Sequence, residues 1–299
     1  MRISKKIICI VLVILSTFSS STVVLAKTTK VDTQVNMSSW LWDTQKIVTS
    51  SDQIISFLVK NNVNVLYLQI NYDINIENYK KFIKKASSYN ISVQALDGSP
   101  TWISDIGNSS QKTLFNWLSN YQKKATSVER FKGVHIDVEP YLNSEYSTNP
   151  TKVIQKYQES LSYAIKTSKS LKLTLSVDIP FWFNQTQYNN KYGKGVLAEW
   201  IIKNVNEVVI MAYRDSANGD NGIIKIVQKN IDIAKKYKTK LIIGVETGES
   251  GEGNNITFFE EGQKYMMDEL KKVSDYYKSS KNFGGFAIHY VDSWMNMKS

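Results

Sequence analysis

The sequence predicts a single closed (β/α)8 barrel, and three observations lead to this fold class. Eight short apolar runs rich in β-branched residues or leucine recur along the chain, and amphipathic helical patterns lie between them. Successive runs begin about 25 to 45 residues apart, which is the length of one strand–helix–strand step. We predict that residues 1–26 are removed. About 270 residues then remain, which is close to the usual length of such a barrel. An open sheet or a seven-stranded one is the alternative.

Each apolar run is suited to a strand buried on both faces, and parallel neighbours need the helical crossovers that the pattern supplies. The predicted strands are Ser38–Trp42, Val63–Asn71, Ile91–Asp97, Gly133–Glu139, Leu171–Ile179, Glu207–Tyr213, Lys240–Glu246 and Gly284–Tyr290. Apolar residues at every third or fourth position predict the helices. These are Ser51–Lys60, Glu77–Tyr89, Thr113–Ala125, Lys152–Ser168, Val196–Lys203, Ile223–Tyr237 and Gln263–Lys278. No stretch rich in proline, glycine or serine divides them, so we expect one domain.

Residues 1–26 are predicted to be a secretory signal peptide, and residues 27–299 the barrel domain. The segment has a basic start, an apolar stretch at Ile7–Leu15, and a small-residue cleavage site that ends at Ala26. An uncleaved membrane anchor is the alternative, but the apolar stretch is shorter than the about 20 residues of a span. We therefore expect a secreted protein without stable membrane insertion.

The charge and cysteine content exclude several function classes. The chain has 37 Lys and Arg against 27 Asp and Glu, and its one cysteine, Cys9, lies in the predicted signal peptide. The mature chain therefore has no disulfide. Its scattered lysines predict a solvated surface, and attraction to an anionic cell wall or polymer is the alternative. No basic stripe coincides with a nucleic-acid-binding motif, so we expect no nucleic-acid partner. No glycine-rich phosphate-binding loop follows a strand, so we expect no nucleotide or other cofactor. We also expect the protein to be a monomer.

Polar and aromatic side chains gather where the predicted strands end, which is where such barrels hold their active sites. Because unpaired carboxylates inside an apolar barrel are costly, this accumulation indicates a functional site. The candidates are Trp42, Asp97, His135, Asp137, Glu139, Asp178, Trp182, Tyr213, Asp215, Glu246, His289, Tyr290, Asp292 and Trp294. The simpler alternative is that polar residues only mark where the strands reach solvent.

The strongest single pattern is the alternation of His135, Asp137 and Glu139, which places three ionisable side chains on one face of a strand. Two nearby carboxyl groups suit acid–base chemistry, because like charges raise the pKa of one of them. A buried hydrogen-bonded pair without chemistry is the alternative. His135 and His289 also raise the alternative of a metal site. The sequence contains neither of two common metal-binding patterns, His-x-His and His-Glu-x-x-His, so we expect no bound metal.

Aromatic residues at the same strand ends indicate the class of ligand. Trp42, Trp182, Tyr213, Tyr290 and Trp294 all lie at or just beyond predicted strand ends. Flat apolar ring faces beside carboxyl groups suit the C–H faces of sugar rings. We therefore expect a polysaccharide or other glycan as the substrate.

Two segments carry a family resemblance. Residues 131–139, which read Phe-Lys-Gly-Val-His-Ile-Asp-Val-Glu, resemble the fourth-strand signature of the family 18 glycoside hydrolases, the chitinase-like barrels. Met211-Ala-Tyr213 resembles the Met-x-Tyr pattern of their sixth strand. The resemblance implies that Glu139 is the general acid, that Asp137 orients an N-acetyl group of the substrate, and that Tyr213 hydrogen-bonds that group.

The sequence departs from the family pattern at three strands, and other interpretations stay open. Strand three ends in Ala95-Leu-Asp97-Gly-Ser, where the family has Ser-x-Gly-Gly. His135 stands where the innermost aspartate is expected, and His289 where a tryptophan is expected on strand eight. One alternative is a sugar-binding barrel without catalysis. A second is a two-glutamate retaining glycosidase with Glu139 as the acid and Glu246 as the nucleophile. A third is a metal-dependent barrel of the deacetylase or amidase kind.

Overall fold

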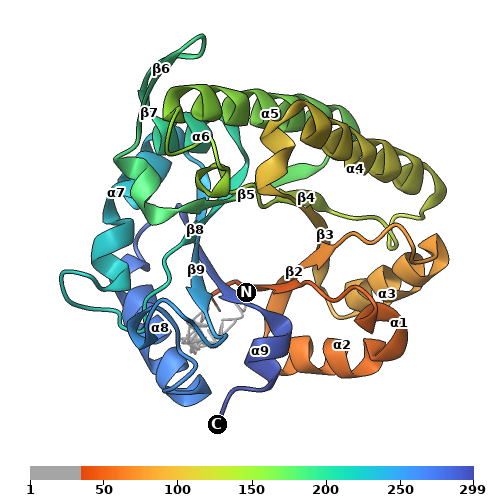
Figure 1. Cartoon of the computed structure of the whole chain (residues 1–299). Coiled ribbons are helices and arrows are strands. Elements are labelled where there is room, and N and C mark those ends of the chain that lie inside the picture. Colours follow the sequence, from red (N-terminus) through yellow and green to blue (C-terminus); the bar gives the residue numbers. More distant parts are fainter. Residues whose placement is uncertain (1–34) are drawn as a thin grey trace, which may run out of the picture. The chain divides into compact units, whose positions relative to one another are not determined.

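Eight parallel strands close into a barrel in the computed structural model, which describes residues 35–299 (Figure 1). In chain order they are β1 (Met37–Leu41), β2 (Val63–Gln69), β3 (Ser92–Asp97), β4 (Gly133–Ile136), β5 (Thr174–Pro180), β8 (Glu207–Met211), β9 (Lys240–Glu246) and β10 (Phe283–His289). Around the barrel β1 pairs with both β2 and β10, which closes the ring. The predicted fold class and its eight strands are therefore confirmed. The predicted signal peptide, residues 1–26, lies outside the described residues.

Helices surround the barrel and alternate with its strands (Figure 1). They are α1 (Lys46–Thr49), α2 (Ser51–Lys60), α3 (Ile76–Ser88), α4 (Asp105–Lys124), α5 (Pro150–Leu171), α6 (Leu197–Asn204), α7 (Ile223–Tyr237), α8 (Gln263–Tyr277) and α9 (Val291–Met295). Helix α2 and helix α7 have the predicted bounds, because the apolar pattern and the helix ends coincide there. In α5 the Asn149 side chain accepts a hydrogen bond from the Lys152 amide, and Pro150 occupies the first turn. None of the helices in residues 35–299 is long and apolar enough to cross a membrane.

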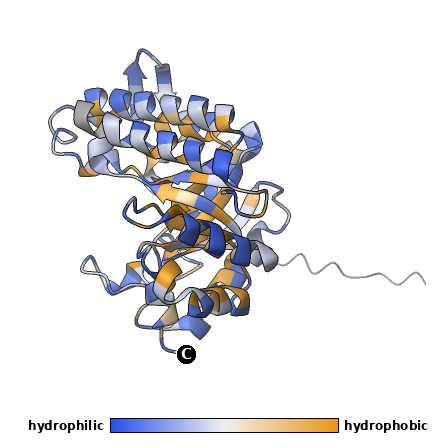
Figure 2. Ribbon diagram, turned by 90° about the vertical axis from the view of Figure 1, so that its right-hand side faces the viewer, coloured by the Kyte–Doolittle hydropathy of each residue, from blue (hydrophilic) through white to orange (hydrophobic). Residues whose placement is uncertain are grey.

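The strands are buried on both faces, which explains their continuous apolar runs. Their outward side chains join the helices in the main core, whereas the barrel interior holds a smaller cluster of its own. That inner cluster consists of Trp40, Tyr67, Leu96, Val209, Ile242 and Ala287. Figure 2 shows hydrophobic residues concentrated in the centre and hydrophilic ones on the outer helical faces. The barrel interior is thus packed with side chains and forms no open channel.

The short helices α1 and α9, the 3₁₀ helices and one hairpin were not predicted. Strands β6 (Gln187–Asn190) and β7 (Gly193–Val196) form an antiparallel hairpin outside the barrel. The Asn190 amide donates a hydrogen bond to the Gln158 side chain on α5, at 2.8 Å. Because the hairpin residues are mostly polar or glycine, they carry none of the apolar alternation that identifies a strand in a sequence.

Candidate functional site

Glu139 and Asp137 follow directly on β4 and lie beside the end of β3. The Asp137 amide donates to the Asp97 carbonyl oxygen at 3.2 Å, so the two segments stay paired beyond the end of β4. Val138 between them is 2% exposed, whereas both acidic residues are partly accessible. This alternation points Asp137 and Glu139 to the side opposite Val138, as expected for extended chain.

Gly98 allows this close approach of β3 and β4. A Cβ atom at position 98 would lie 1.8 Å from the Asp137 carbonyl oxygen, a distance that no real side chain tolerates. The Gly98 amide also donates to the Asp97 carboxylate at 2.8 Å. Gly98 therefore helps to place Asp137, although it was not among the predicted site residues.

The Glu139 carboxyl group is half-buried, and one hydrogen bond from the described residues 35–299 holds it. The Tyr141 hydroxyl donates to its Oε1 atom. Burial raises the pKa of Glu139, the Tyr141 bond lowers it, and the negative charge of Asp178 raises it again, with a net increase. A carboxylic acid that stays protonated to a higher pH than usual can serve as a proton donor.

The Asp137 carboxyl group is more deeply placed. Its Oδ1 atom is buried and has no hydrogen-bond partner among residues 35–299. Burial raises the pKa of Asp137 well above its usual range, and the charges of Asp178 and Glu139 add to the increase. Both carboxyl groups therefore have pKa values above those of exposed carboxylates.

Asp178, from β5, belongs to the same group and is tied to the barrel interior. Its Oδ2 atom is 2.6 Å from Nε2 of His135 and accepts a bond from the Trp40 indole at 3.2 Å. The His135 ring stacks on Tyr67 with ring centroids 3.8 Å apart, and is fully buried. His135 therefore supports Asp178 from below and does not itself face the barrel mouth.

A second group joins the ends of β1, β9 and β10. The Trp42 indole donates to Nε2 of His289 at 3.1 Å, and Nδ1 of His289 is 2.7 Å from Oε2 of Glu246. An indole N–H can only donate, so Nε2 accepts and the His289 proton lies on Nδ1, facing the carboxylate. The amides of Thr247 and Gly248 donate to the other Glu246 oxygen, at 2.8 and 2.6 Å. Both oxygens of Glu246 are therefore engaged.

Tyr213 lies between the two groups. Its ring stacks on His289 with centroids 5.9 Å apart, and no partner of its hydroxyl group occurs within residues 35–299. Burial raises the pKa of Tyr213 well above its usual range, and four carboxyl groups raise it further. In order of effect these belong to Glu246, Asp178, Asp137 and Glu139. The Tyr213 hydroxyl therefore remains a hydrogen-bond donor in an acidic surrounding.

Other predicted residues form the rim of this site. Trp182 packs edge-on against Tyr141 with centroids 5.2 Å apart, and Tyr290 lies 5.0 Å from the His289 ring. The Asp97 carboxylate accepts from the Tyr72 hydroxyl at 3.3 Å. A groove of about 410 Å³ adjoins the end of β2. Its lining residues are Trp42, Asp43, Thr44, Gln69, Ile70, Asn71, Tyr72 and Asp73.

The structure does not bring two predicted residues, Trp294 and Asp292, to the site. The chain turns into α9 directly after Tyr290, and Trp294 packs at 1% exposure against Phe57, ring centroids 5.2 Å apart. Asp292 on the same helix forms an ion pair with Lys46 of α1. Asp215, in contrast, lies in the β8–α7 loop beyond the carboxyl end of β8, where its amide donates to the Asn255 carbonyl oxygen.

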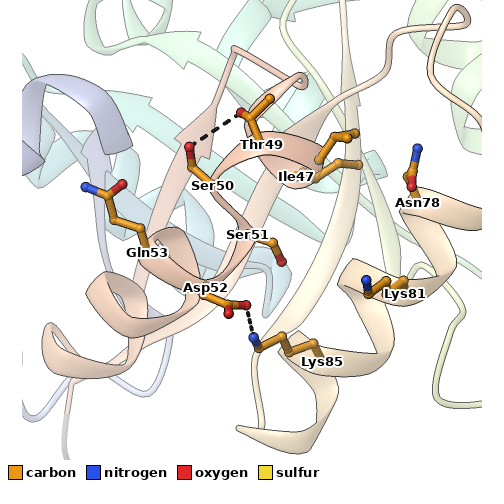
Figure 3. A pocket seen from close by; sticks show the side chains of 10 residues that line it. Ile47, Thr49, Ser50, Ser51, Asp52, Gln53, Asn78, Lys81 and Lys85 are labelled. Atoms are coloured by element: carbon orange, nitrogen blue, oxygen red, sulfur yellow. Dashed lines mark hydrogen bonds and ion pairs between the residues drawn. The ribbon is translucent and has the colours of Figure 1, made fainter.

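Two further features bear on alternative ligands. Within the part of the chain that the structure describes, no three His, Cys, Asp or Glu residues are grouped so as to hold a metal ion. A groove of about 440 Å³ lies in the helical shell, lined by residues of α1, α2 and α3 (Figure 3). Its one ion pair, Asp52 with Lys85, is solvent-exposed, and the groove contains none of the site residues.

Comparisons with known proteins bear on the fold. No family model and no curated protein sequence matches the chain. Solved structures do match: catalytic domain 2 of the Ostrinia furnacalis Group II chitinase is 10% identical, with a TM-score of 0.55, over 86% of this chain and 90% of that one. The family GH18 chitinase from Cycas revoluta, in complex with allosamidin, is 12% identical, with a TM-score of 0.52, over 87% and 95%.

A third solved structure is the spore cortex-lytic enzyme SleL from Bacillus megaterium, which is 14% identical, with a TM-score of 0.51, over 87% of this chain and 72% of that one. At such identities the likeness concerns the fold. The chain therefore has the (β/α)8-barrel fold of the family 18 chitinases.

Proposed function

We propose that the protein is a glycoside hydrolase that acts on a polysaccharide containing N-acetylhexosamine, or on another cell-wall or extracellular polysaccharide. The observation that carries the proposal is the half-buried Glu139 carboxyl group, with its raised pKa, at the carboxyl end of β4 beside Asp137. The similar structures support it, since one is a chitinase domain with a bound N-acetylated chitooligosaccharide and another is a cortex-lytic enzyme.

In the proposed reaction Glu139 is the general acid. Its proton passes to the glycosidic oxygen, and the bonding pair of the breaking C–O bond stays with that oxygen. The carbonyl oxygen of the substrate's own N-acetyl group attacks the anomeric carbon, and water later opens the resulting ring. Asp137 orients and stabilises the N-acetyl group, while the free Tyr213 hydroxyl donates a hydrogen bond to its oxygen.

The surroundings of Glu246 favour this scheme over the two-glutamate one. Three donors hold the Glu246 carboxylate, from His289, Thr247 and Gly248. These hydrogen bonds stabilise the negative charge of the carboxylate and engage its lone pairs, so Glu246 is a poor nucleophile. The Tyr213 hydroxyl, in contrast, has no hydrogen-bond partner in residues 35–299, and the charge of Asp137 raises its pKa. The substrate-assisted scheme requires a free tyrosine hydroxyl and an aspartate near the same N-acetyl group.

The test is the release of reducing ends from a panel of N-acetylated and other polysaccharides. We expect Glu139→Gln, which keeps the shape but cannot donate a proton in the same way, to lower kcat by about 10²- to 10⁴-fold. The circular dichroism spectrum should remain that of the wild type. Undiminished turnover by the variant would reject the role of Glu139.

A sugar-binding barrel without catalysis is the second candidate. The observation that favours it is His289, which is locked by Trp42 and Glu246 where the family pattern has a tryptophan. Glycan binding by the wild type without any release of reducing ends would support this candidate.

We also propose that the mature protein is secreted and monomeric. The basis for secretion is the signal-like pattern of residues 1–26. Amino-terminal sequencing of protein from the culture medium, followed by light scattering, tests both statements.

A further inference from the structure

Tyr141 is the residue in direct contact with Glu139 that the family resemblance does not explain. It lies two residues after Glu139, in the short 3₁₀ helix η2 (Pro140–Leu142) that begins where β4 and its extension end. Its hydroxyl donates to Oε1 of Glu139. A hydrogen bond from a hydroxyl group to an ionised carboxylate is charge-assisted, and it is therefore stronger than a hydrogen bond between two neutral groups.

The Tyr141 ring is held in place independently of that bond. It packs edge-on against Trp182, with centroids 5.2 Å apart, and against Phe183, with centroids 6.2 Å apart. The Leu142 amide donates to the Glu139 carbonyl at 3.1 Å, and Pro140 restricts the backbone between the two side chains. The donor is therefore pre-positioned on a rigid turn.

Asp137 does not supply this support. No hydrogen bond joins Asp137 to Glu139 in residues 35–299, and Oδ1 of Asp137 is buried without a partner there. The Tyr141 hydroxyl is the group that fixes the Glu139 carboxyl, and it occupies Oε1 alone. The proton of the neutral acid is consequently directed to Oε2, which has no hydrogen-bond partner within residues 35–299.

We propose that Tyr141 is a positioning residue that selects Oε2 of Glu139 as the proton-donating oxygen. This inference rests on the proposed hydrolase function. In the transfer step the Oε2–H bond breaks, its electron pair stays on Glu139, and the proton bonds to the leaving glycosidic oxygen. The new negative charge is shared with Oε1, where the Tyr141 hydrogen bond strengthens and stabilises it. Burial and the adjacent carboxylate raise the pKa of Tyr141, so the hydroxyl stays a donor throughout.

The test compares Tyr141→Phe with the wild type. This change keeps the ring against Trp182 and removes only the hydroxyl. We expect kcat to fall about 10-fold or more with KM nearly unchanged, because the lost bond is charge-assisted. The ionised form of Glu139 also loses its donor, so the basic limb of the kcat/KM profile should move upward by about one pH unit. Tyr146→Phe, in the same β4–α5 connection, is the matched control and should behave as the wild type.

A second measurement separates this inference from the proposed function. The carboxyl carbon of Glu139, observed by ¹³C NMR during a pH titration, reports its pKa whether or not the protein is catalytic. A higher Glu139 pKa in Tyr141→Phe supports the positioning role even if no polysaccharide is cleaved, in which case the proposed function alone fails. An unchanged Glu139 pKa, or a basic limb that stays in place while kcat falls, would overturn the inference.

Discussion

At the residue scale, the deep placement of Asp137 works against stability at neutral pH. Burial, with the charges of Asp178 and Glu139, raises its pKa well above the usual range. In the unfolded chain an aspartate titrates near 3.9, so the folded state binds this proton more tightly. The contribution of the group to the free energy of unfolding is therefore largest at acidic pH and declines as pH rises from about 4 through the raised pKa.

Asp137→Asn should consequently raise the melting temperature at pH 7, because it places a neutral group of the same shape in the buried position. The increase should be about 2 to 4 °C for each kcal/mol recovered, and it should vanish towards pH 4, where the wild-type group is protonated. Calorimetry at several pH values measures this. A variant that melts below the wild type at pH 7 would contradict the account of Asp137.

At the element scale, the meeting of β3 and the extension of β4 depends on Gly98. Gly98→Ala places a Cβ atom 1.8 Å from the Asp137 carbonyl oxygen, so the backbone must move. We expect a loss of about 1–3 kcal/mol in the free energy of unfolding, with reduced activity because Asp137 and Glu139 shift with the backbone. Denaturant titration measures the loss.

Gly251→Ala is the matched control for this change, since no atom lies within 4 Å of a Cβ built there. It should leave both stability and activity close to those of the wild type. Equal effects of the two substitutions would show that the strand contact at Gly98 is not the cause.

The site shows at the same scale what the sequence can and cannot predict. Strand ends in a parallel barrel meet at one mouth, so the convergence of Asp137, Asp178 and Glu246 follows from the order of the strands. Which partner each acquires depends on register and rotamer, and so the bond from Tyr141 to Glu139 had no signal in the sequence. The sequence predicts Trp294 at the site because it follows β10 closely, but α9 turns it into the core against Phe57.

At the scale of the whole molecule, the fold was predictable because apolar strands and amphipathic helices alternate along the whole barrel domain. The sequence has eight such strands with seven predicted helices between them, and the crossover rule leaves few ways to arrange them. The β6–β7 hairpin escaped prediction because it packs on the outside and needs no apolar face of its own. The barrel therefore supplies a packed frame, and the chemistry rests on the few polar groups that it gathers at one end.

The central claim is that Glu139 holds a proton that it donates to a bound saccharide. The most direct measurement compares the pKa of Glu139, obtained by ¹³C NMR, with the basic limb of the kcat/KM profile of the wild type. We predict that the two coincide and lie above the usual value for a glutamate, as burial beside Asp178 requires. A Glu139 that titrates at or below that usual value, or a basic limb unrelated to its titration, would contradict the claim.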